Sequence, residues 1–294
     1  MEHPSVEGFW WFVQERERVR LCKQAGQAPP WTDDPTLQRY HFCNIRRADD
    51  FGTQWYVQQV AASVLGGRAK GRIFNESWAV DLVWSTIVYR LVNNVEWFDA
   101  FGHVPTYEEW KRVKRPMTKR ILAMKRKPYS LAYRVLMGGI EKGGSRAERL
   151  VDILNDLEQS IVELAASVAG AHTLERAWQI VQRTHGVGPF TALQIVRDLM
   201  LVDFLPSEWE NDFTYLGPGA QLGLELLGFS PKYHLMYGVT HGLRDEQPVE
   251  IQPPLVLGDI EHCLCEYAKH VKFRDGRGRR RRYQPHVQDM AIHG

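Results

Sequence analysis

The sequence is poor in cysteine and has no long apolar run. Its four cysteines, Cys22, Cys43, Cys263 and Cys265, form no CxxC pair and no spacing typical of zinc or iron–sulfur centres. We expect them to be reduced thiols of an intracellular protein. No segment approaches the roughly 20 apolar residues of a membrane helix, and the N-terminus does not resemble a signal peptide. These absences predict a soluble, cytoplasmic protein without a membrane partner.

A strong overall charge is also missing. The formal net charge is +2 over 294 residues, so any surface for nucleic acid must be local. One local concentration is the C-terminal tail, residues 272–294, which contains the consecutive arginines Arg279, Arg280, Arg281 and Arg282. Arginine matches phosphate geometry, so we predict a DNA-binding arm. A solvated basic tail is the alternative.

Apolar residues recur mainly at helical spacing, and alternating strand patterns are scarce. The pattern predicts an all-α protein. We expect one domain over residues 1–271, made of two helical lobes that flank a cleft. Thr32 and Asp33 are expected to cap a helix through Tyr40, and Thr106 with Glu109 to form the capping box of a short helix. The other predicted helices cover residues 8–24, 76–93, 146–169, 173–183, 190–201, 220–228 and 259–271.

A glycine-containing hairpin at about 174–200 is the most specific local motif. Its centre reads THGVGPFTA, residues 184–192, between two predicted helices. Gly186 and Gly188 allow a tight turn whose N–H groups, with the following helix start, can bind a DNA phosphate. A simple helix–turn–helix loop is the alternative. The predicted DNA-binding residues of the hairpin are His185, Gly186, Val187, Gly188 and Thr191.

This string resembles the helix-hairpin-helix of base-excision DNA glycosylases. The resemblance implies a catalytic aspartate after the hairpin, and Asp212 matches that position better than Asp203; a helix cap is the other interpretation of Asp212. Phe190 occupies the position at which bifunctional glycosylases carry a lysine nucleophile, so Schiff-base lyase chemistry is not expected.

Further strings have no counterpart in a generic glycosylase. They are WTDDP (31–35), FCNIRR (42–47) with Asp50, Arg90 with Asn93, GPGA (217–220), and Glu261 followed by LCEY (264–267) and Lys269. In this order they resemble the α-glutamyl/putrescinyl thymine pyrophosphorylase family, from about Phe9 to Tyr283. That family is itself similar to the helical domain of some 5-hydroxymethyluracil DNA kinases. A GxxxxGK[ST] string is absent, so we do not expect the kinase itself.

The resemblance implies a phage amino acid:DNA transferase acting in the cytoplasm of the bacterial host. An amino acid such as glycine, or a polyamine, would displace pyrophosphate from a flipped-out 5-(pyrophosphoryloxymethyl)uracil in double-stranded DNA. The implied partners are this activated DNA, the amine and, through the pathway, a 5-hydroxymethyluracil DNA kinase. No tightly bound cofactor is expected, and a divalent cation that accompanies pyrophosphate is left open.

Candidate residues follow from what this reaction needs. Asp212 and Glu266 are the first choices to accept the amine proton and orient the amine. Arginines and backbone N–H groups would bind pyrophosphate, and asparagine amides could read the uracil edge. The remaining catalytic candidates are Asp33 and Asp34, for which helix capping is the alternative. The substrate-binding candidates are Asn44, Arg47, Asp50, Arg90, Asn93, Gly217, Gly219 and Lys269, with turn contacts or ordinary ion pairs as their alternative roles.

Two other functions remain open from the sequence. The chain could be a monofunctional glycosylase that removes a modified base, or a non-enzymatic DNA-binding accessory module of a base kinase. Cys43 could also add covalently to the pyrimidine ring, although a packed thiol is the simpler interpretation. The histidines show no metal-binding spacing, and the ligands of any divalent ion, Asp or Glu with phosphate oxygens, are left open.

Overall fold

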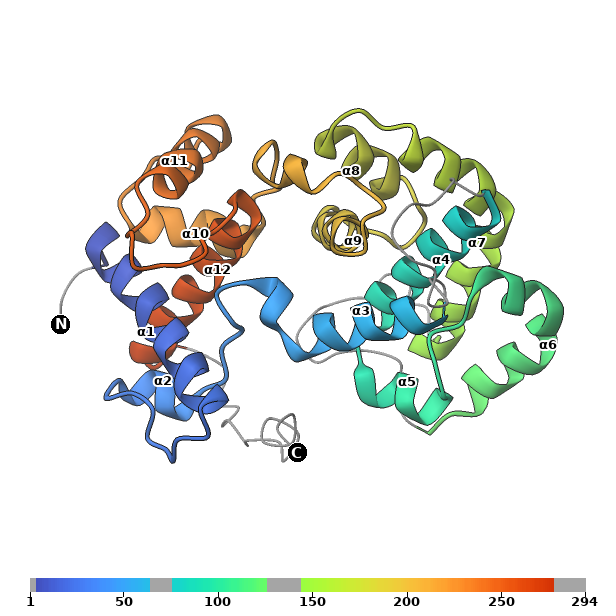
Figure 1. The fold of residues 1–294 in the computed structure, drawn as a ribbon, viewed down its shortest axis with the longest axis horizontal. Helices are drawn as coiled ribbons and strands as arrows, with labels where there is room; N and C mark the ends of the chain where they lie inside the picture. Colours follow the sequence, from blue (N-terminus) through green and yellow to red (C-terminus); the bar gives the residue numbers. More distant parts are fainter. Residues whose placement is uncertain (1–3, 64–75, 126–143, 278–294) are drawn as a thin grey trace. The chain divides into compact units, whose positions relative to one another are not determined.

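A computed structural model describes residues 4–63, 76–125 and 144–277. These residues form twelve α-helices and contain no β-strand, which confirms the all-α prediction (Figure 1). The four consecutive arginines of the predicted DNA-binding arm, Arg279 to Arg282, lie outside the described residues. In the described part of the chain, no helix combines the length and the apolar character needed to cross a bilayer.

The chain divides into two compact units. The first comprises Met1–Asp50 and Thr214–Gly294, and the second comprises Phe51–Phe213. The described part of the first unit contains five helices: α1 (Val6–Gln24), α2 (Pro35–Arg39), α10 (Pro218–Leu226), α11 (Tyr233–Asp245) and α12 (Leu257–Arg274). The second unit, in its described residues, contains seven helices: α3 (Phe51–Ser63), α4 (Glu76–Val92), α5 (Val95–Phe101), α6 (Tyr107–Ala123), α7 (Arg146–Ala169), α8 (Leu174–Gln182) and α9 (Pro189–Leu201). The cleft expected between two lobes stays a prediction.

Helix α12 is the centre of the first unit. It packs against α10, α11, α1 and α2, and its residues Ile260 and Leu264 are fully buried. The approach to α10 is close because Gly223 has no side chain: a Cβ there would lie 2.4 Å from the Leu264 carbonyl oxygen. Phe9 and Phe12 of α1 complete this core. Burying each such side chain stabilises the unit by about 1.5–3 kcal/mol.

Helix α4 is the centre of the second unit. It packs against α7, α9, α6 and α3, and from Ala79 to Val92 nearly every side chain is inaccessible to solvent. Trp84 and Tyr89 are among its largest fully buried side chains. A helix buried on all sides is apolar all round, and this explains the dense apolar run between residues 79 and 92.

Side-chain caps fix the starts of several helices. The Asp34 carboxylate accepts the Leu37 N–H at α2, so the cap lies one residue after the predicted Asp33. Thr106 caps α6 as predicted, but Glu109 pairs with His103 instead of completing a capping box. Helix α6 is also longer than predicted, with 17 residues and non-helical backbone angles at Val113. A reciprocal capping box occurs at α7, between Ser145 and Glu148.

Candidate functional site

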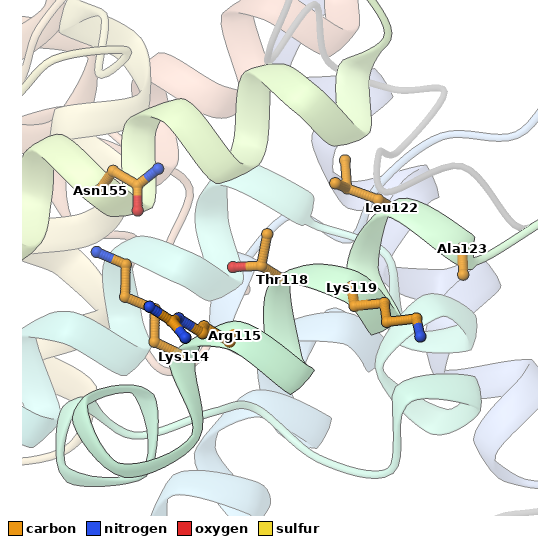
Figure 2. Close-up of a pocket in the computed structure, with 7 residues that line it drawn as sticks. All are labelled: Lys114, Arg115, Thr118, Lys119, Leu122, Ala123 and Asn155. Atoms are coloured by element: carbon orange, nitrogen blue, oxygen red, sulfur yellow. The ribbon is translucent and has the colours of Figure 1, made fainter.

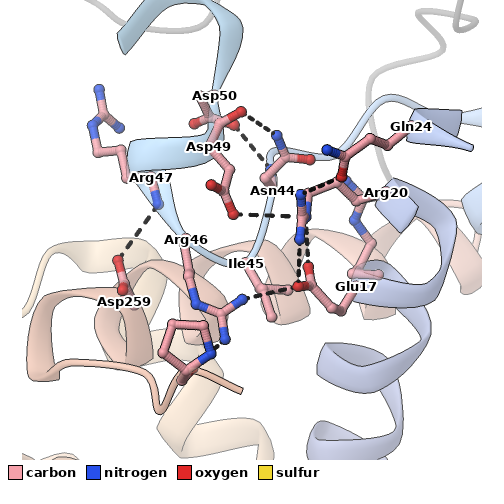
Figure 3. Close-up of polar contacts among 12 residues, drawn as sticks. Glu17, Arg20, Gln24, Asn44, Ile45, Arg46, Arg47, Asp49, Asp50 and Asp259 are labelled. Atoms are coloured by element: carbon pink, nitrogen blue, oxygen red, sulfur yellow. Dashed lines mark hydrogen bonds and ion pairs between the residues drawn. The ribbon is translucent and has the colours of Figure 1, made fainter. Parts of the chain in front are cut away.

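The segment that follows α2, residues 40–50, carries half of the predicted substrate-binding residues of the first unit. Arg46 holds it in place, because its guanidinium pairs with Glu17 of α1 at 2.9 Å and donates to the Pro253 carbonyl oxygen. Asn44 Nδ2 donates to the Asp49 carbonyl oxygen at 2.8 Å, and the Asn44 N–H donates to Asp50 Oδ1 at 3.0 Å (Figure 3). The segment is therefore an ordered part of the first unit.

Helix α12 supplies the opposite side of this site. Glu266 Oε2 accepts the backbone N–H of Cys43 at 2.9 Å and the Lys269 ammonium at 3.0 Å. Lys269 also lies over the ring of Phe42, with its Nζ 4.8 Å from the ring centre. The structure thus brings together the FCN and LCEY strings, which are far apart in the sequence.

Three chemically different side chains converge beside this contact. One ligand-type atom from each of Cys43, Asp50 and His262 lies within 4.8 Å of those of the other two. His262, in the second turn of α12, is buried with 8% of its surface exposed. Its Nε2 atom has no hydrogen-bond partner among the described residues. The sequence reasoning did not single out His262, because one histidine on a buried helix face looks like a core residue.

Burial governs the protonation of this cluster. It raises the pKa of the Cys43 thiol well above its ordinary value and raises the pKa of the Asp50 carboxyl. Burial likewise lowers the pKa of His262 and favours its neutral ring. For Glu266, burial would raise the pKa, but Lys269 and the Cys43 N–H outweigh burial and lower it. Glu266 is therefore a carboxylate paired with a cation.

Arg47 lies on the same side of α12 as Cys43, Asp50 and His262 and is near enough to influence the pKa of each, whereas the Gly217–Gly219 turn contacts another side of the helix. The Arg47 side chain is 4% exposed, and its backbone N–H donates weakly to Asp259 at 3.5 Å (Figure 3). The Gly217 N–H donates to Glu261 Oε1 at 3.2 Å. Gly219 lies against Cys265, because a Cβ at Gly219 would be 2.3 Å from the Cys265 sulfur. The N–H predicted to bind pyrophosphate at Gly217 is thus engaged within the protein.

The two aspartates of the WTDDP string differ in their surroundings. Asp34 combines its capping role with a contact to His270 Nε2 at 3.3 Å, and burial is the largest influence on its pKa. The contact with His270 and the backbone N–H donors outweigh burial, so the pKa of Asp34 is lowered. Asp33 is exposed. The catalytic roles predicted for both stay predictions.

Arg90 and Asn93 belong to the second unit. Arg90 forms a two-pronged ion pair with Asp198 of α9, in which the side chains are 3% and 1% exposed. Its Nη1 donates to Asn93 Oδ1 at 3.1 Å. These contacts tie α4 to α9 inside the second unit. Asp212 is exposed at the end of the short 3-10 helix Ser207–Asn211, also in the second unit.

The predicted hairpin connects α8 to α9. Gly186 has a φ of +81°, and a Cβ there would be 2.3 Å from the Ile153 side chain, so the turn requires glycine and lies directly on α7. Gly188 precedes α9 without a side-chain cap, and Thr191 follows in its first turn. Val187 is buried and anchors the turn. His185 is exposed and bonds to Asp156 and Arg149 of α7.

A basic groove lies along α6, which the sequence reasoning missed. Six of the ten residues from 111 to 120 are lysine or arginine, and this run was the available signal. The groove has a volume of about 850 Å³ (Figure 2). Its lining consists of Lys114, Arg115, Thr118, Lys119, Leu122, Ala123 and Asn155. Lys114 pairs with Glu158 of α7, whereas Met117 and Ile121 on the other face of α6 are buried.

Comparisons with known proteins place this arrangement in a class of DNA-modification proteins. Residues 3–279 match the family described as "5-hmdU DNA kinase, helical domain". The chain therefore belongs to that family. It is also 26% identical, over 276 residues, to the 5-hmdU DNA kinase of Bacillus phage SP10. The match covers 84% of this chain and 42% of the phage protein, so the chain spans less than half the length of this relative. No solved structure matches.

These comparisons correct the interpretation of the sequence strings. The assignment to the α-glutamyl/putrescinyl thymine pyrophosphorylase family is wrong, because the matching family is the helical domain of 5-hmdU DNA kinases. The amino acid:DNA transferase function inferred from that assignment is wrong for the same reason, since the similarity indicates a kinase. The expected connection with phage DNA modification at hydroxymethyluracil is confirmed at the level of the family.

Proposed function

We propose that this chain binds double-stranded DNA carrying 5-hydroxymethyluracil and presents that base for phosphorylation, as part of a 5-hmdU DNA kinase activity. The observation that carries the proposal is the family match over residues 3–279. The similarity covers 42% of the phage kinase, and the 294 residues contain no GxxxxGK[ST] string. The part of the activity that we assign to this chain is therefore recognition of the DNA and of the base.

The hairpin between α8 and α9 supports a grip on the DNA backbone. The start of α9 directs N–H groups and the positive end of the helix dipole outward, and no side chain caps it. Gly188 is exposed, and a Cβ there would meet no protein atom within 4 Å, so a phosphate can approach its backbone. We propose that this is a helix-hairpin-helix of the DNA glycosylase type, which holds one strand without reading its sequence.

The groove along α6 supports a second contact with phosphates. Arg115 and Lys119 present two cations beside Thr118 and Asn155, whose polar groups can donate hydrogen bonds to phosphate oxygens (Figure 2). Lys114 is partly neutralised by Glu158. A surface of this kind contributes affinity that falls with added salt, because binding releases counterions from the DNA.

Extrusion of the base fits the requirements of this chemistry. Transfer of a phosphoryl group needs close positioning of the hydroxymethyl oxygen and exclusion of water. A stacked base cannot be enclosed, and its extrusion costs a few kcal/mol. We propose that contacts with the strand on either side of the modified base offset this cost.

Equilibrium binding to matched duplexes tests the proposal. Three duplexes would carry thymine, 5-hydroxymethyluracil or 5-hydroxymethylcytosine at one position, and fluorescence anisotropy would give each dissociation constant. We expect the 5-hydroxymethyluracil duplex to bind at least tenfold more tightly than the thymine duplex, a difference of about 1.4 kcal/mol. The 5-hydroxymethylcytosine duplex controls for the hydroxymethyl group alone and should resemble thymine. Equal affinities for the 5-hydroxymethyluracil and thymine duplexes would contradict the proposal.

A further inference from the structure

The structure contains a cluster of three side chains whose donor types suit a metal ion. One donor atom each from Cys43, Asp50 and His262 lies within 4.8 Å of the others. We propose that these three side chains bind one zinc ion in the first unit. The proposal is independent of the DNA-binding function, because it rests only on this cluster.

The set of donors favours zinc over other common cations. A thiolate, an imidazole and a carboxylate are the three ligand types of zinc sites. Magnesium and calcium prefer oxygen ligands alone, so a cysteine sulfur disfavours both. Zinc–ligand bonds of about 2.0–2.3 Å in a tetrahedron place the donor atoms roughly 3.5 Å apart. The donor atoms, which lie within 4.8 Å of one another, would have to move closer together on binding to reach that spacing.

His262 provides an independent observation that a ligand is needed. The residue is 8% exposed, its Nε2 atom is buried, and that atom has no hydrogen-bond partner among the described residues. A buried ring nitrogen without a partner loses its bonds to water and gains nothing in exchange. Coordination to zinc would satisfy the nitrogen, because neutral imidazole is a good zinc ligand.

The charges of the ligand set balance those of the ion. On binding, the Cys43 thiol would lose its proton to solvent, and the sulfur–zinc bond would form. One thiolate and one carboxylate then neutralise the two positive charges of zinc, and His262 stays neutral. The ion together with its three ligands then has no net charge, which suits a buried position, where an uncompensated charge is costly.

The residues around the cluster are arranged to orient its ligands. The Cys43 N–H is held by Glu266 at 2.9 Å, and the Asn44 N–H holds one oxygen of Asp50 at 3.0 Å. His262 and Glu266 are four residues apart on α12 and therefore share a face of the helix. Contacts of this second layer fix the direction of metal ligands. A zinc ion here would join residues 43–50 to α12 and leave a fourth position to water.

Cobalt and zinc binding by the untagged full chain tests the proposal. Cobalt(II) replaces zinc and gives a thiolate-to-cobalt absorption band in the near ultraviolet when a cysteine is bound. Elemental analysis after dialysis in a zinc buffer gives the zinc content per chain. The variants would be Cys43→Ser, Asp50→Asn and His262→Gln, with Cys22→Ser as the matched cysteine control on α1. Circular dichroism would show that each variant is folded.

We expect one equivalent of zinc per chain, with the cobalt band present in the natural sequence and in Cys22→Ser. Cys43→Ser should lose the band, and Asp50→Asn and His262→Gln should each weaken zinc binding at least tenfold. The proposal is overturned if the natural sequence retains no zinc and shows no band, or if the band persists in Cys43→Ser. The first of these results needs no variant, so a folding defect cannot obscure it. DNA is absent from the assay, so its outcome does not depend on the proposed function.

Discussion

The backbone N–H of Cys43 donates a 2.9 Å hydrogen bond to Oε2 of Glu266, 223 residues further along the chain. This bond joins the segment after α2 to the last helix of the first unit. Glu266 accepts the Lys269 ammonium at the same oxygen. One carboxylate therefore binds both the backbone N–H of Cys43 and the side chain of Lys269. The stability of the first unit should therefore depend on the charge of Glu266.

The variant Glu266→Gln tests this dependence. Because the pKa of Glu266 is lowered in the folded state, its contribution to stability is present above its unfolded pKa. That contribution is lost as the pH falls through the lower folded pKa. We expect the variant to be less stable by about 1–2 kcal/mol at neutral pH, and the difference to shrink in acid. Urea unfolding of both proteins between neutral and acidic pH measures it.

The natural sequence must be compared with Glu266→Gln because the ionisation of Asp50 changes the stability with pH in the opposite direction. Burial raises the pKa of Asp50, so its ionisation destabilises the fold at higher pH. Asp50 is present in both proteins, and its contribution largely cancels in the difference. A stability difference that stays constant down to strongly acidic pH would contradict the role assigned to Glu266.

The ion pair between Arg90 and Asp198 should be essential to the second unit. Replacing Asp198 by Ala leaves the Arg90 guanidinium buried without its counterion, and we expect a loss of about 3–5 kcal/mol. The double variant Arg90→Met with Asp198→Leu should recover most of that loss, since it removes both buried charges. Denaturant unfolding measures each. Lys111→Ala, at an exposed pair with Glu108, is the control and should leave the stability nearly unchanged. A mild effect of Asp198→Ala would show that the pair is not buried.

The two hairpin glycines should respond differently to alanine. Gly186→Ala combines a positive φ with a Cβ that collides with Ile153, and we expect a loss of about 2 kcal/mol. Gly188→Ala has a φ of −85° and open space, so its stability should change by less than about 0.5 kcal/mol. If a phosphate contacts the Gly188 backbone, this stable variant should nevertheless bind DNA more weakly. Unchanged affinity in Gly188→Ala would remove the hairpin from the binding surface.

The α6 groove should contribute to binding through charge. Replacing Lys119 by Ala removes one cation from the groove, and we expect the slope of log affinity against log salt to decrease by about 1. The loss should be the same for thymine and 5-hydroxymethyluracil duplexes, because phosphates carry no base identity. Arg18→Ala, at an exposed ion pair with Glu15 on α1, removes the same charge and serves as the control. An unchanged slope in Lys119→Ala would exclude this groove from the DNA interface.

Most helices could be predicted because their patterns are local. Helix α7 has the bounds predicted from its apolar spacing, Arg146–Ala169, and α12 differs from its prediction by a few residues. Helices α3, α5 and α11 were missed. Helix α5 has only seven residues, and α11 contains Gly238 and Gly242, which weaken a helical pattern. Tertiary packing stabilises such helices, and that packing is not visible in a single segment.

The site was predictable in its residue types but not in its pairings. The sequence analysis selected Glu266 with Lys269 from one string and Asn44 with Asp50 from another. The structure places these residues in one site. His262 escaped notice because its role depends on which loop packs over α12. The family was misassigned because the α-glutamyl/putrescinyl thymine pyrophosphorylase family is similar to the helical domain of 5-hydroxymethyluracil DNA kinases, and the sequence strings alone did not separate the two. The basic run at 111–120 was overlooked because the C-terminal arginines form a more conspicuous run.

Direct competition between two duplexes tests the central claim. A 5-hydroxymethyluracil duplex and a thymine duplex, identical otherwise and labelled with different dyes, would compete for a limiting amount of the protein in one solution. Our account predicts that the bound fraction is enriched at least tenfold in the 5-hydroxymethyluracil duplex, and that swapping the dyes leaves the enrichment unchanged. Equal proportions of the two duplexes in the bound and unbound fractions would contradict it.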